Sequence, residues 1–278
     1  MYNRNMIPML QPTHKDARKF VAFSCPHAPL HDKHALGVIR DRIAEYQPDY
    51  IICLGDLHEA DSASKWPSEY DFTLEDEYRS ASNEVLKPLR ESAGDDVKCF
   101  LLPGNHDANI EEIGRIDAGL RPLCDWKKPQ YDSDGVWINE ELCEHWQIPR
   151  RYDYSKHNTF KLGKVTFAHG WEAGGGSDKF ECVYLADPNG LYVRGHTHRP
   201  TGGEPKQVMM SQTMPLPYYY LNAGCTRDLN PDYMARKRKV MWGQGVVYGW
   251  SQINSSGAMR KGKTWDAYCE IIRMHGDA

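Results

Sequence analysis

Five short polar clusters in the chain carry the side-chain types that bind metal ions. Imidazole, carboxylate and carboxamide groups together form a mixed nitrogen and oxygen donor set suited to Zn, Mn or Fe. A carboxylate such as Asp56 can also bridge two ions and so build a centre that activates water. The clusters are Ser24-Cys25-Pro26-His27, Gly55-Asp56-Leu57-His58-Glu59, Gly104-Asn105-His106-Asp107, Ala168-His169-Gly170 and Gly195-His196-Thr197-His198.

The third cluster, at residues 104–107, shows why position matters. Gly104 allows the backbone to turn sharply at the end of a strand, so that the next side chains can project into a cleft. Taken alone, an Asn-His-Asp run also fills ordinary turns through local hydrogen bonds, and a lone His is usually a structural or surface residue. The five clusters each follow an apolar, β-rich run, which indicates that they converge on one place.

The first half of the chain alternates strands and helices. We expect strands at 20–23, 50–54 and 97–102, because these runs are apolar, and helices at 32–46 and 74–90, because their apolar residues recur at helical spacing. This order predicts a βαβ unit and a third strand. Open α/β sheets place their ligands at the carboxyl ends of parallel strands, which is where the first three clusters fall.

The second half is less regular. We interpret residues 109–155 as an insert or cap in a single domain spanning 1–278, with a short helix near 139–146. A hairpin is predicted where strands 159–162 and 165–168 flank Gly163-Lys164. Further strands are expected at 191–194, 217–221, 244–248 and 267–272.

Composition sets broad limits on the protein. The chain has 278 residues, 40% of them hydrophobic, and a formal net charge of −4, which gives no global attraction to nucleic acid or to an acidic membrane. Residues 1–19 lack the apolar core of a signal peptide, and no stretch approaches a membrane span. We therefore expect a soluble, cytoplasmic protein with no membrane partner. The eight cysteines form no CxxC pair, so most should be reduced.

The clusters, in their order along the chain, resemble those of the calcineurin-like metallophosphoesterases. The resemblance covers residues 20 to about 225 and includes Gly-Asp-x-x-Glu, Gly-Asn-His-Asp, a His followed by Gly, and Gly-His-x-His. Cys25-Pro26-His27 stands in place of the usual Asp-x-His. The family fold that this implies is α/β, with two mixed β-sheets packed as a sandwich and helices outside, in four layers.

The resemblance also implies roles for individual residues. One metal ion would take Cys25, His27, Asp56 and His198, and the other would take Asp56, Asn105, His169 and His196. His106 corresponds to the family's general acid, or to a positive charge facing the phosphoryl oxygens. Glu59 stands where an acid commonly orients that imidazole. Asp107 would support the loop, and His58 occupies a variable position that we treat as non-catalytic.

The resemblance implies hydrolysis of a phosphoester. Two cations about 3.5–4 Å apart lower the pKa of a bridging water, and the resulting hydroxide attacks phosphorus in line. Ala60-Asp61-Ser62 follows Glu59 where protein Ser/Thr phosphatases continue with Asp-Arg-Gly, which argues against a phosphoprotein substrate. A scaffold with the same fold and a decayed metal site is the alternative from another functional class.

The substrate is less closely defined by the sequence. Trp66, Tyr70 and the aromatic residues of the insert could stack a nucleobase, and the basic run at 236–239 could contact a phosphate backbone. Each feature is also typical of ordinary packing or of a solvated surface. A nucleotide or nucleic-acid phosphodiester is our first choice, and a small phosphomonoester is the second.

Cys25 is the main departure from the family pattern. A thiol beside a divalent cation loses its proton and becomes a ligand, so Cys25 would supply the same single negative charge as Asp. The thiolate favours Zn or Fe over Mn, because sulfur is the softer donor. In the alternative interpretation, Cys25 merely fits the turn before Pro26, and the first metal is weak or lost.

Overall fold

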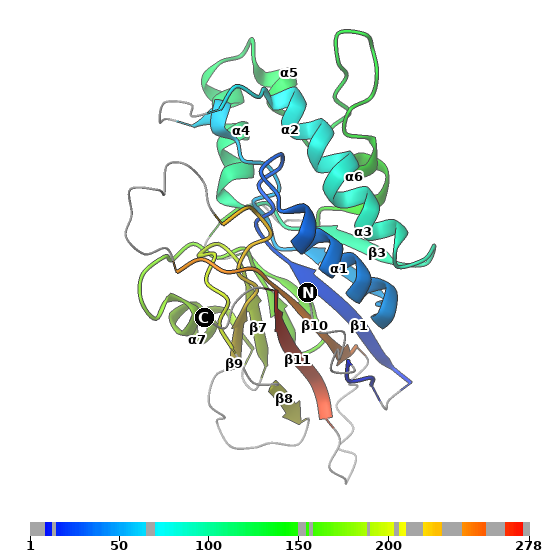
Figure 1. The fold of residues 1–278 in the computed structure, drawn as a ribbon. Coiled ribbons are helices and arrows are strands. Elements are labelled where there is room, and N and C mark those ends of the chain that lie inside the picture. Colours follow the sequence, from blue (N-terminus) through cyan, green and yellow to red (C-terminus); the bar gives the residue numbers. More distant parts are fainter. Residues whose placement is uncertain are drawn as a thin grey trace.

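Two β-sheets pack face to face, with helices on both outer surfaces (Figure 1). This arrangement of four layers is the predicted α/β sandwich. The computed structural model describes residues 9–12, 15–64, 70–149, 154–155, 158–187, 190–202, 206–209, 219–229, 241–253 and 265–274.

The larger sheet is mixed. Among the described residues it has seven strands in the order β4-β3-β2-β1-β10-β11-β8. β1 to β4 are parallel, while β10, β11 and β8 are antiparallel to their neighbours. The strands are β1 (Ala17–Phe23), β2 (Tyr50–Cys53), β3 (Lys98–Leu101), β4 (Trp146–Gln147), β8 (Lys206–Met209), β10 (Gly245–Gln252) and β11 (Trp265–Arg273).

The smaller sheet has the order β5-β6-β7-β9 in the part of the chain that the structure describes. β5 and β6 form the predicted antiparallel hairpin, and β6, β7 and β9 are parallel. The strands are β5 (Phe160–Leu162), β6 (Val165–Phe167), β7 (Leu191–Arg194) and β9 (Tyr219–Asn222).

The core follows from alternation along the strands. In β1, Val21 and Phe23 pack against the helices, whereas Phe20 and Ala22 face the smaller sheet. All four side chains are fully buried. A strand buried on both faces reads as a continuous apolar run, which is why these residues show no polar alternation.

The helices that cover the larger sheet begin at recognisable caps. Asp32 accepts hydrogen bonds from the backbone N–H groups of His34 and Ala35, and Thr73 forms a capping box with Asp76. The predicted 32–46 helix is α1 (Lys33–Tyr46). The predicted 74–90 helix is confirmed as a continuous run with a π-helical turn at its centre, comprising α2 (Leu74–Ser80), η2 (Ala81–Leu86) and α3 (Lys87–Glu91).

Residues 105–124 differ from the expectation of an irregular insert. α4 (Asn105–Ile116) begins within the central polar cluster, so its apolar positions belong to a helix that packs on the core. α5 (Arg121–Cys124) and α6 (Glu140–His145) follow, and β4 then adds an edge strand to the larger sheet. The short helix predicted near 139–146 is present as α6.

Two tryptophans of this segment lie in the core, whereas Tyr131 is 58% exposed. Trp126 is fully buried and donates its indole N–H to the Asp107 carbonyl, and Trp146 is also part of the core. Buried rings cannot stack on a substrate base. Trp66 and the basic run at 236–239 lie outside the described residues.

Two further helices complete the described elements, η1 (Asp61–Ala63) and α7 (Ser177–Leu185), which packs on the outer face of the smaller sheet. All eight cysteines are free thiols, as predicted. No helix in the described ranges is long and apolar enough to cross a membrane.

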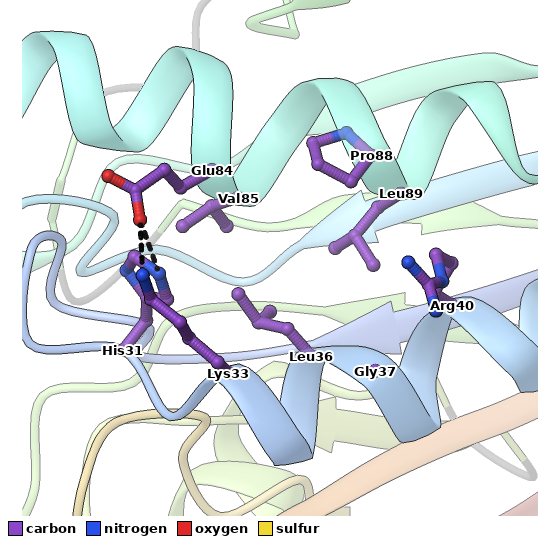
Figure 2. A pocket seen from close by; sticks show the side chains of 9 residues that line it. All are labelled: His31, Lys33, Leu36, Gly37, Arg40, Glu84, Val85, Pro88 and Leu89. Carbon is purple, nitrogen blue, oxygen red and sulfur yellow. Dashed lines mark ion pairs between the residues drawn. The ribbon is translucent and has the colours of Figure 1, made fainter.

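A hollow lies between α1 and the π-helical turn. Figure 2 shows His31 and Lys33 reaching toward Glu84, with Nε2 and Nζ at 3.5 Å and 3.2 Å from its Oε2 atom. The π-helical turn supplies Glu84 and Val85 to the wall of this hollow. Its lining shares no residue with the cluster of metal-binding side chains described next.

Candidate metal centre

The five polar clusters meet at one edge of the sandwich. They follow β1, β2 and β3 of the larger sheet and β6 and β7 of the smaller one. Backbone hydrogen bonds join neighbouring loops: the N–H of Cys25 donates to Gly55, that of His27 to Asp56, and that of Gly195 to His169. The carboxyl ends of parallel strands therefore deliver all five clusters to the same place.

The first group of donor atoms belongs to Cys25, His27, Asp56 and His198. One potential ligand atom from each of these residues lies within 4.8 Å of the others. All four residues are buried, and the Nε2 atoms of His27 and His198 face each other at 3.1 Å. This is the set that the resemblance implies for one metal ion.

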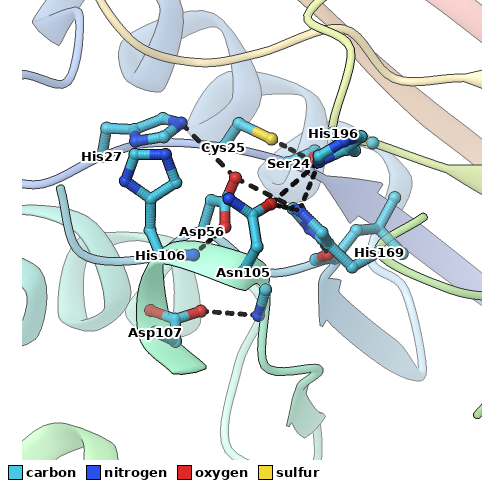
Figure 3. A network of polar contacts seen from close by, with 12 residues as sticks. Ser24, Cys25, His27, Asp56, Asn105, His106, Asp107, His169 and His196 are labelled. Carbon is cyan, nitrogen blue, oxygen red and sulfur yellow. Dashed lines mark hydrogen bonds and ion pairs between the residues drawn. The ribbon is translucent and has the colours of Figure 1, made fainter. Parts of the chain in front are cut away.

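The second group contains Asp56, His169 and His196, whose potential ligand atoms also lie within 4.8 Å of one another. Asn105 joins it, because its Oδ1 atom lies 3.1 Å from His169 Nε2 and 2.9 Å from His196 Nδ1 (Figure 3). These residues are the set implied for the other metal ion.

Asp56 belongs to both groups through a single oxygen atom. Its Oδ2 lies 3.8 Å from His27 Nε2 and 3.2 Å from His169 Nε2. Its other oxygen, Oδ1, accepts a hydrogen bond of 2.9 Å from the backbone N–H of His106. The carboxylate is thus fixed with one oxygen between the two donor groups, which is the position a bridging ligand needs.

The backbone of the site is strained where the donors lie. Five residues that are not glycine have positive φ angles here: Cys25 (53°), His27 (52°), Asp56 (50°), His196 (71°) and His198 (57°). The left-handed region disfavours a residue with a Cβ atom by about 1–2 kcal/mol. Strain of this kind clusters at functional sites, where it aims side chains that an ordinary turn would not bring together.

Two glycines permit the close approach of the loops. A Cβ atom on Gly104 would lie 2.2 Å from Asp56 Oδ1, and one on Gly195 would lie 1.7 Å from Ser24 Oγ. Neither position can hold a larger residue without displacing a polar cluster. The glycines of the Gly-Asn-His-Asp and Gly-His-x-His runs are therefore required by packing.

Electrostatics keeps most of these donors in the form that binds a cation. Burial lowers the pKa of His27 and of His198 well below the usual range for histidine, and burial next to His169 lowers the pKa of His196 to about 3. Burial opposes the charged form of Asp56, but His169, His106 and His27 hold its pKa well below the usual range. The neutral imidazoles of His27, His196 and His198 beside an ionised carboxylate fit a divalent cation.

Cys25 lies in a different electrostatic setting. Burial, together with the Asp56 carboxylate, raises the pKa of its thiol well above the ordinary value. The Sγ atom lies 2.9 Å from Ser24 Oγ, within hydrogen-bonding distance. A positive charge between Cys25 and Asp56 would reverse both effects, because it would stabilise the thiolate and the carboxylate together.

Glu59 has a different partner from the one that the resemblance implied. Its carboxylate lies 2.7 Å from His27 Nδ1 and 3.1 Å from Arg227 Nη1, so it orients a metal-ligand candidate. The imidazole of His106 is held at Nδ1 by the Glu59 backbone carbonyl instead. Although burial lowers it, the pKa of His106 is raised overall by Asp56 and Glu59.

Asp107 supports the loops, as its sequence position indicated. Its carboxylate accepts hydrogen bonds from the backbone N–H groups of Leu57, His58 and Gly104. Its Oδ1 also lies 2.9 Å from His58 Nδ1. Burial raises the pKa of Asp107, but the contact with His58 outweighs this effect, so the pKa is lowered overall. His58 is fully buried and does not line the cleft.

Several residues of the site, among them Arg199, Arg227 and Trp242, were not among the sequence candidates. Arg227 is buried against Glu59, and the ring of Trp242 lies 4.5 Å from the ring of His198. Arg227 could have been found, because Gly224-Cys225-Thr226-Arg227 follows a predicted strand just as the five clusters follow theirs. Trp242 carries no comparable signal.

The donor groups open into a cleft of about 280 Å³. The guanidinium groups of Arg199 and Arg227 form part of its wall, together with His106 and Trp242. Among the described residues that line the cleft, Asp56 is the one acidic side chain, and it is already paired with imidazoles. Such a cleft suits an anion.

The sequence of residues 18–200 matches the sequence pattern of one protein family, the calcineurin-like phosphoesterases. The chain belongs to the calcineurin-like phosphoesterase family. The match covers all five polar clusters, so the family's sequence pattern coincides with the observed group of donor atoms. The fold expected for such a phosphoesterase is the one observed. No sequence among curated proteins matches the chain.

Solved structures with a similar fold come from several organisms. Wild-type Vps29 of Entamoeba histolytica, solved in complex with Zn²⁺, shares 13% identity, with a TM-score of 0.39 over 92% of this chain and 98% of that one. Vacuolar protein sorting 29 of Cryptosporidium parvum shares 12% identity, with a TM-score of 0.39 over 93% of this chain and 99% of that one. The nuclease MPE of Pseudomonas putida shares 14% identity, with a TM-score of 0.35 over 74% of this chain and 73% of that one.

Proposed function

We propose that this member of the family is a metal-dependent phosphoester hydrolase that binds two transition-metal ions and favours a nucleotide-type phosphodiester. The observation that carries the proposal is the position of Asp56 Oδ2 between two complete donor groups. A single buried carboxylate oxygen facing imidazoles on both sides is typical of a dinuclear centre.

The donor set fits two Zn, Fe or Mn ions. One ion would be held by Cys25, His27, Asp56 and His198, and the other by Asp56, Asn105, His169 and His196. When bound, two such ions activate a water molecule near neutral pH and neutralise charge on the phosphoryl oxygens. The thiolate candidate at Cys25 favours Zn or Fe at the first position.

His106 is placed to move a proton to the leaving group. Its Nδ1 donates to the Glu59 carbonyl, which fixes the tautomer and leaves Nε2 as the atom that exchanges protons. Although burial lowers it, Asp56 and Glu59 raise the pKa of His106, and in its protonated form Nε2 can protonate the departing alkoxide. His27 and His106 pack edge to face, with ring centroids 4.6 Å apart.

Arg227 and Arg199 supply positive charge at the cleft wall. Arg227 is fixed by its ion pair with Glu59, which also lies against His27, so the same acid places a metal ligand and a cation. A pre-positioned guanidinium stabilises charge that develops on phosphoryl oxygens. Ala60-Asp61-Ser62 follows Glu59 in place of the Asp-Arg-Gly of protein Ser/Thr phosphatases, which argues against a phosphoprotein substrate.

The test compares a diester with a monoester. Metal-stripped protein is reloaded with Mn, Zn or Fe and assayed on bis-p-nitrophenyl phosphate and on p-nitrophenyl phosphate. We expect activity with at least one metal and a higher kcat/KM on the diester. Asp56→Asn should abolish it, whereas Asp134→Asn, at an exposed turn, should not. A higher kcat/KM on the monoester would reverse the substrate ranking, and inactivity with every metal would contradict hydrolysis.

A further inference from the structure

Three aromatic side chains form a cluster on and beside α7, in which Phe180 and Tyr184 are exposed and Trp171 is half-buried. We call Trp171, Phe180 and Tyr184 the aromatic platform. Phe180 is 56% exposed and Tyr184 is 59% exposed, and Val183 beside them is 46% exposed. Adjacent exposed apolar side chains on a helix that already packs against a sheet point to a binding surface.

The rings of the platform are ordered relative to one another. Those of Phe180 and Tyr184 are nearly parallel, at 11°, with centroids 6.4 Å apart. The Trp171 ring packs edge-on to both, at 6.5 Å from Phe180 and 6.3 Å from Tyr184. Two nearly parallel rings on exposed residues suit a planar ligand.

The platform is anchored from beneath. Glu181 is fully buried, and its Oε1 accepts hydrogen bonds from the backbone N–H groups of Trp171 and Glu172, at 2.8 Å and 2.7 Å. The same oxygen lies 3.1 Å from the buried guanidinium of Arg194, and Oε2 accepts from the Tyr192 hydroxyl. The segment that carries Trp171 is therefore tied to α7, and the rings have a fixed support.

The platform is continuous with the metal cleft. Trp171 lies two residues after His169, and Ala173 lines the cleft itself. A shallow hollow next to Ala173 is lined by residues 172 and 174–177 and by Phe180. A ligand in the cleft can therefore extend onto the platform along this segment.

The glycines of this segment are not demanded by internal packing. A Cβ atom added to Gly174, Gly175 or Gly176 would meet no atom of the described residues within 4 Å, in contrast to Gly104 in the site. Gly176 alone has a positive φ, of 81°. The three glycines between the cleft and the aromatic surface leave room for an extended ligand to pass beside the exposed Glu172.

We propose that the aromatic platform stacks nucleobases of a single-stranded nucleic acid whose phosphodiester lies in the metal cleft. The inference rests on the proposed phosphodiesterase function and narrows its substrate class. Bases stack on aromatic side chains without regard to sequence, because each base has a π face. The backbone of such a strand would pass Arg199 in the cleft wall and the exposed Lys179 on α7.

The experiment measures KM for a fluorescein-labelled single-stranded oligodeoxythymidine and for bis-p-nitrophenyl phosphate, which has no nucleobase. The quantity compared is the KM for the oligonucleotide divided by the KM for bis-p-nitrophenyl phosphate. We expect the double variant Phe180→Ala/Tyr184→Ala to raise this KM ratio by about 5- to 150-fold for each base stack lost. Phe180→Leu should also raise it, since leucine keeps apolar area but has no ring, and Phe180→Trp should keep it near wild type.

Tyr131→Ala is the matched control, because Tyr131 is 58% exposed but lies in the segment between α5 and α6 and lines neither the cleft nor the hollow. Its KM ratio should equal that of the wild type. An unchanged ratio in the double variant, with bis-p-nitrophenyl phosphate still hydrolysed, would overturn the platform and leave the proposed function intact.

Two further outcomes separate the platform from the proposed function. If the wild type hydrolyses neither substrate, anisotropy of the labelled oligonucleotide with metal-free protein tests the platform alone. Weaker binding by the double variant then supports it, and equal binding overturns it. A wild-type dimer that the double variant converts to a monomer, with unchanged oligonucleotide binding, would assign the surface to a second copy of the chain and also overturn the proposal.

Discussion

Replacement of Glu77 by Gln should make the protein more stable, and increasingly so as the pH rises. Glu77 is fully buried in α2, where its Oε2 accepts a hydrogen bond of 2.6 Å from the Ala60 N–H, next to Glu59. Its Oε1 has no hydrogen-bond partner among the described residues. Burial, with the nearby acids Glu59 and Asp61, raises the pKa of Glu77 from 4.5 to about 8.

The sign of the effect follows from proton binding. Between pH 4.5 and about 8 the unfolded chain releases the proton of Glu77, whereas the folded chain keeps it. Stability therefore falls as pH rises through this window, at up to about 1.4 kcal/mol per pH unit. Across the whole window the wild type loses about 5 kcal/mol of its free energy of unfolding. Between pH 5 and 7.5 the loss is about 3 kcal/mol.

Glutamine keeps an acceptor for the Ala60 N–H but cannot ionise. We expect the free energy of unfolding of Glu77→Gln, relative to wild type, to rise by about 3 kcal/mol between pH 5 and 7.5. The assay is urea denaturation of metal-free protein, followed by circular dichroism. Glu75→Gln is the control, because Glu75 lies on the same helix with its side chain 41% exposed. The difference in free energy of unfolding between this variant and the wild type should not change with pH. A constant difference between Glu77→Gln and wild type would refute a raised pKa at Glu77.

Three other predictions concern the site. His106→Ala should keep the bound metal but lower turnover by about 10² to 10⁴, with a smaller loss on a substrate with a very good leaving group. Loss of both metals in this variant would show that a ligand was misassigned. Cys25→Ala should lose one equivalent of metal by elemental analysis, whereas Cys25→Asp should keep both and shift the preferred metal toward Mn; full occupancy and turnover in Cys25→Ala would remove Cys25 from the ligand set. Gly104→Ala should lower the melting temperature and metal content together, because its Cβ would lie 2.2 Å from Asp56 Oδ1; unchanged metal affinity would contradict the tight packing.

The predicted elements that hold the site depend on local patterns. The apolar runs before Cys25, Asp56 and Asn105 are strands that contribute side chains to both large hydrophobic clusters, so their composition favours strands. Each polar cluster begins where its run ends. The order of strands and clusters along the chain was therefore enough to predict that the donors converge.

The remaining features depend on contacts between distant segments. Glu59 pairs with Arg227, which is 168 residues away, and no local pattern encodes that pairing. β4 is only two residues long and gains its identity by pairing with β3. α4 begins inside the Asn-His-Asp run because Asp107 accepts a hydrogen bond from the Gly104 N–H at the first turn, a geometry that its turn-like residues conceal.

Metal content of the wild type and of single-ligand variants tests the central claim most directly. After reconstitution and removal of free metal, inductively coupled plasma mass spectrometry should find about two equivalents in the wild type. His198→Ala and His196→Ala, which each remove a donor from one group, should retain about one, and Asp56→Ala, which removes the shared oxygen, should retain none. A wild type without bound metal, or an Asp56→Ala variant that still binds two equivalents, would contradict a dinuclear centre bridged by Asp56.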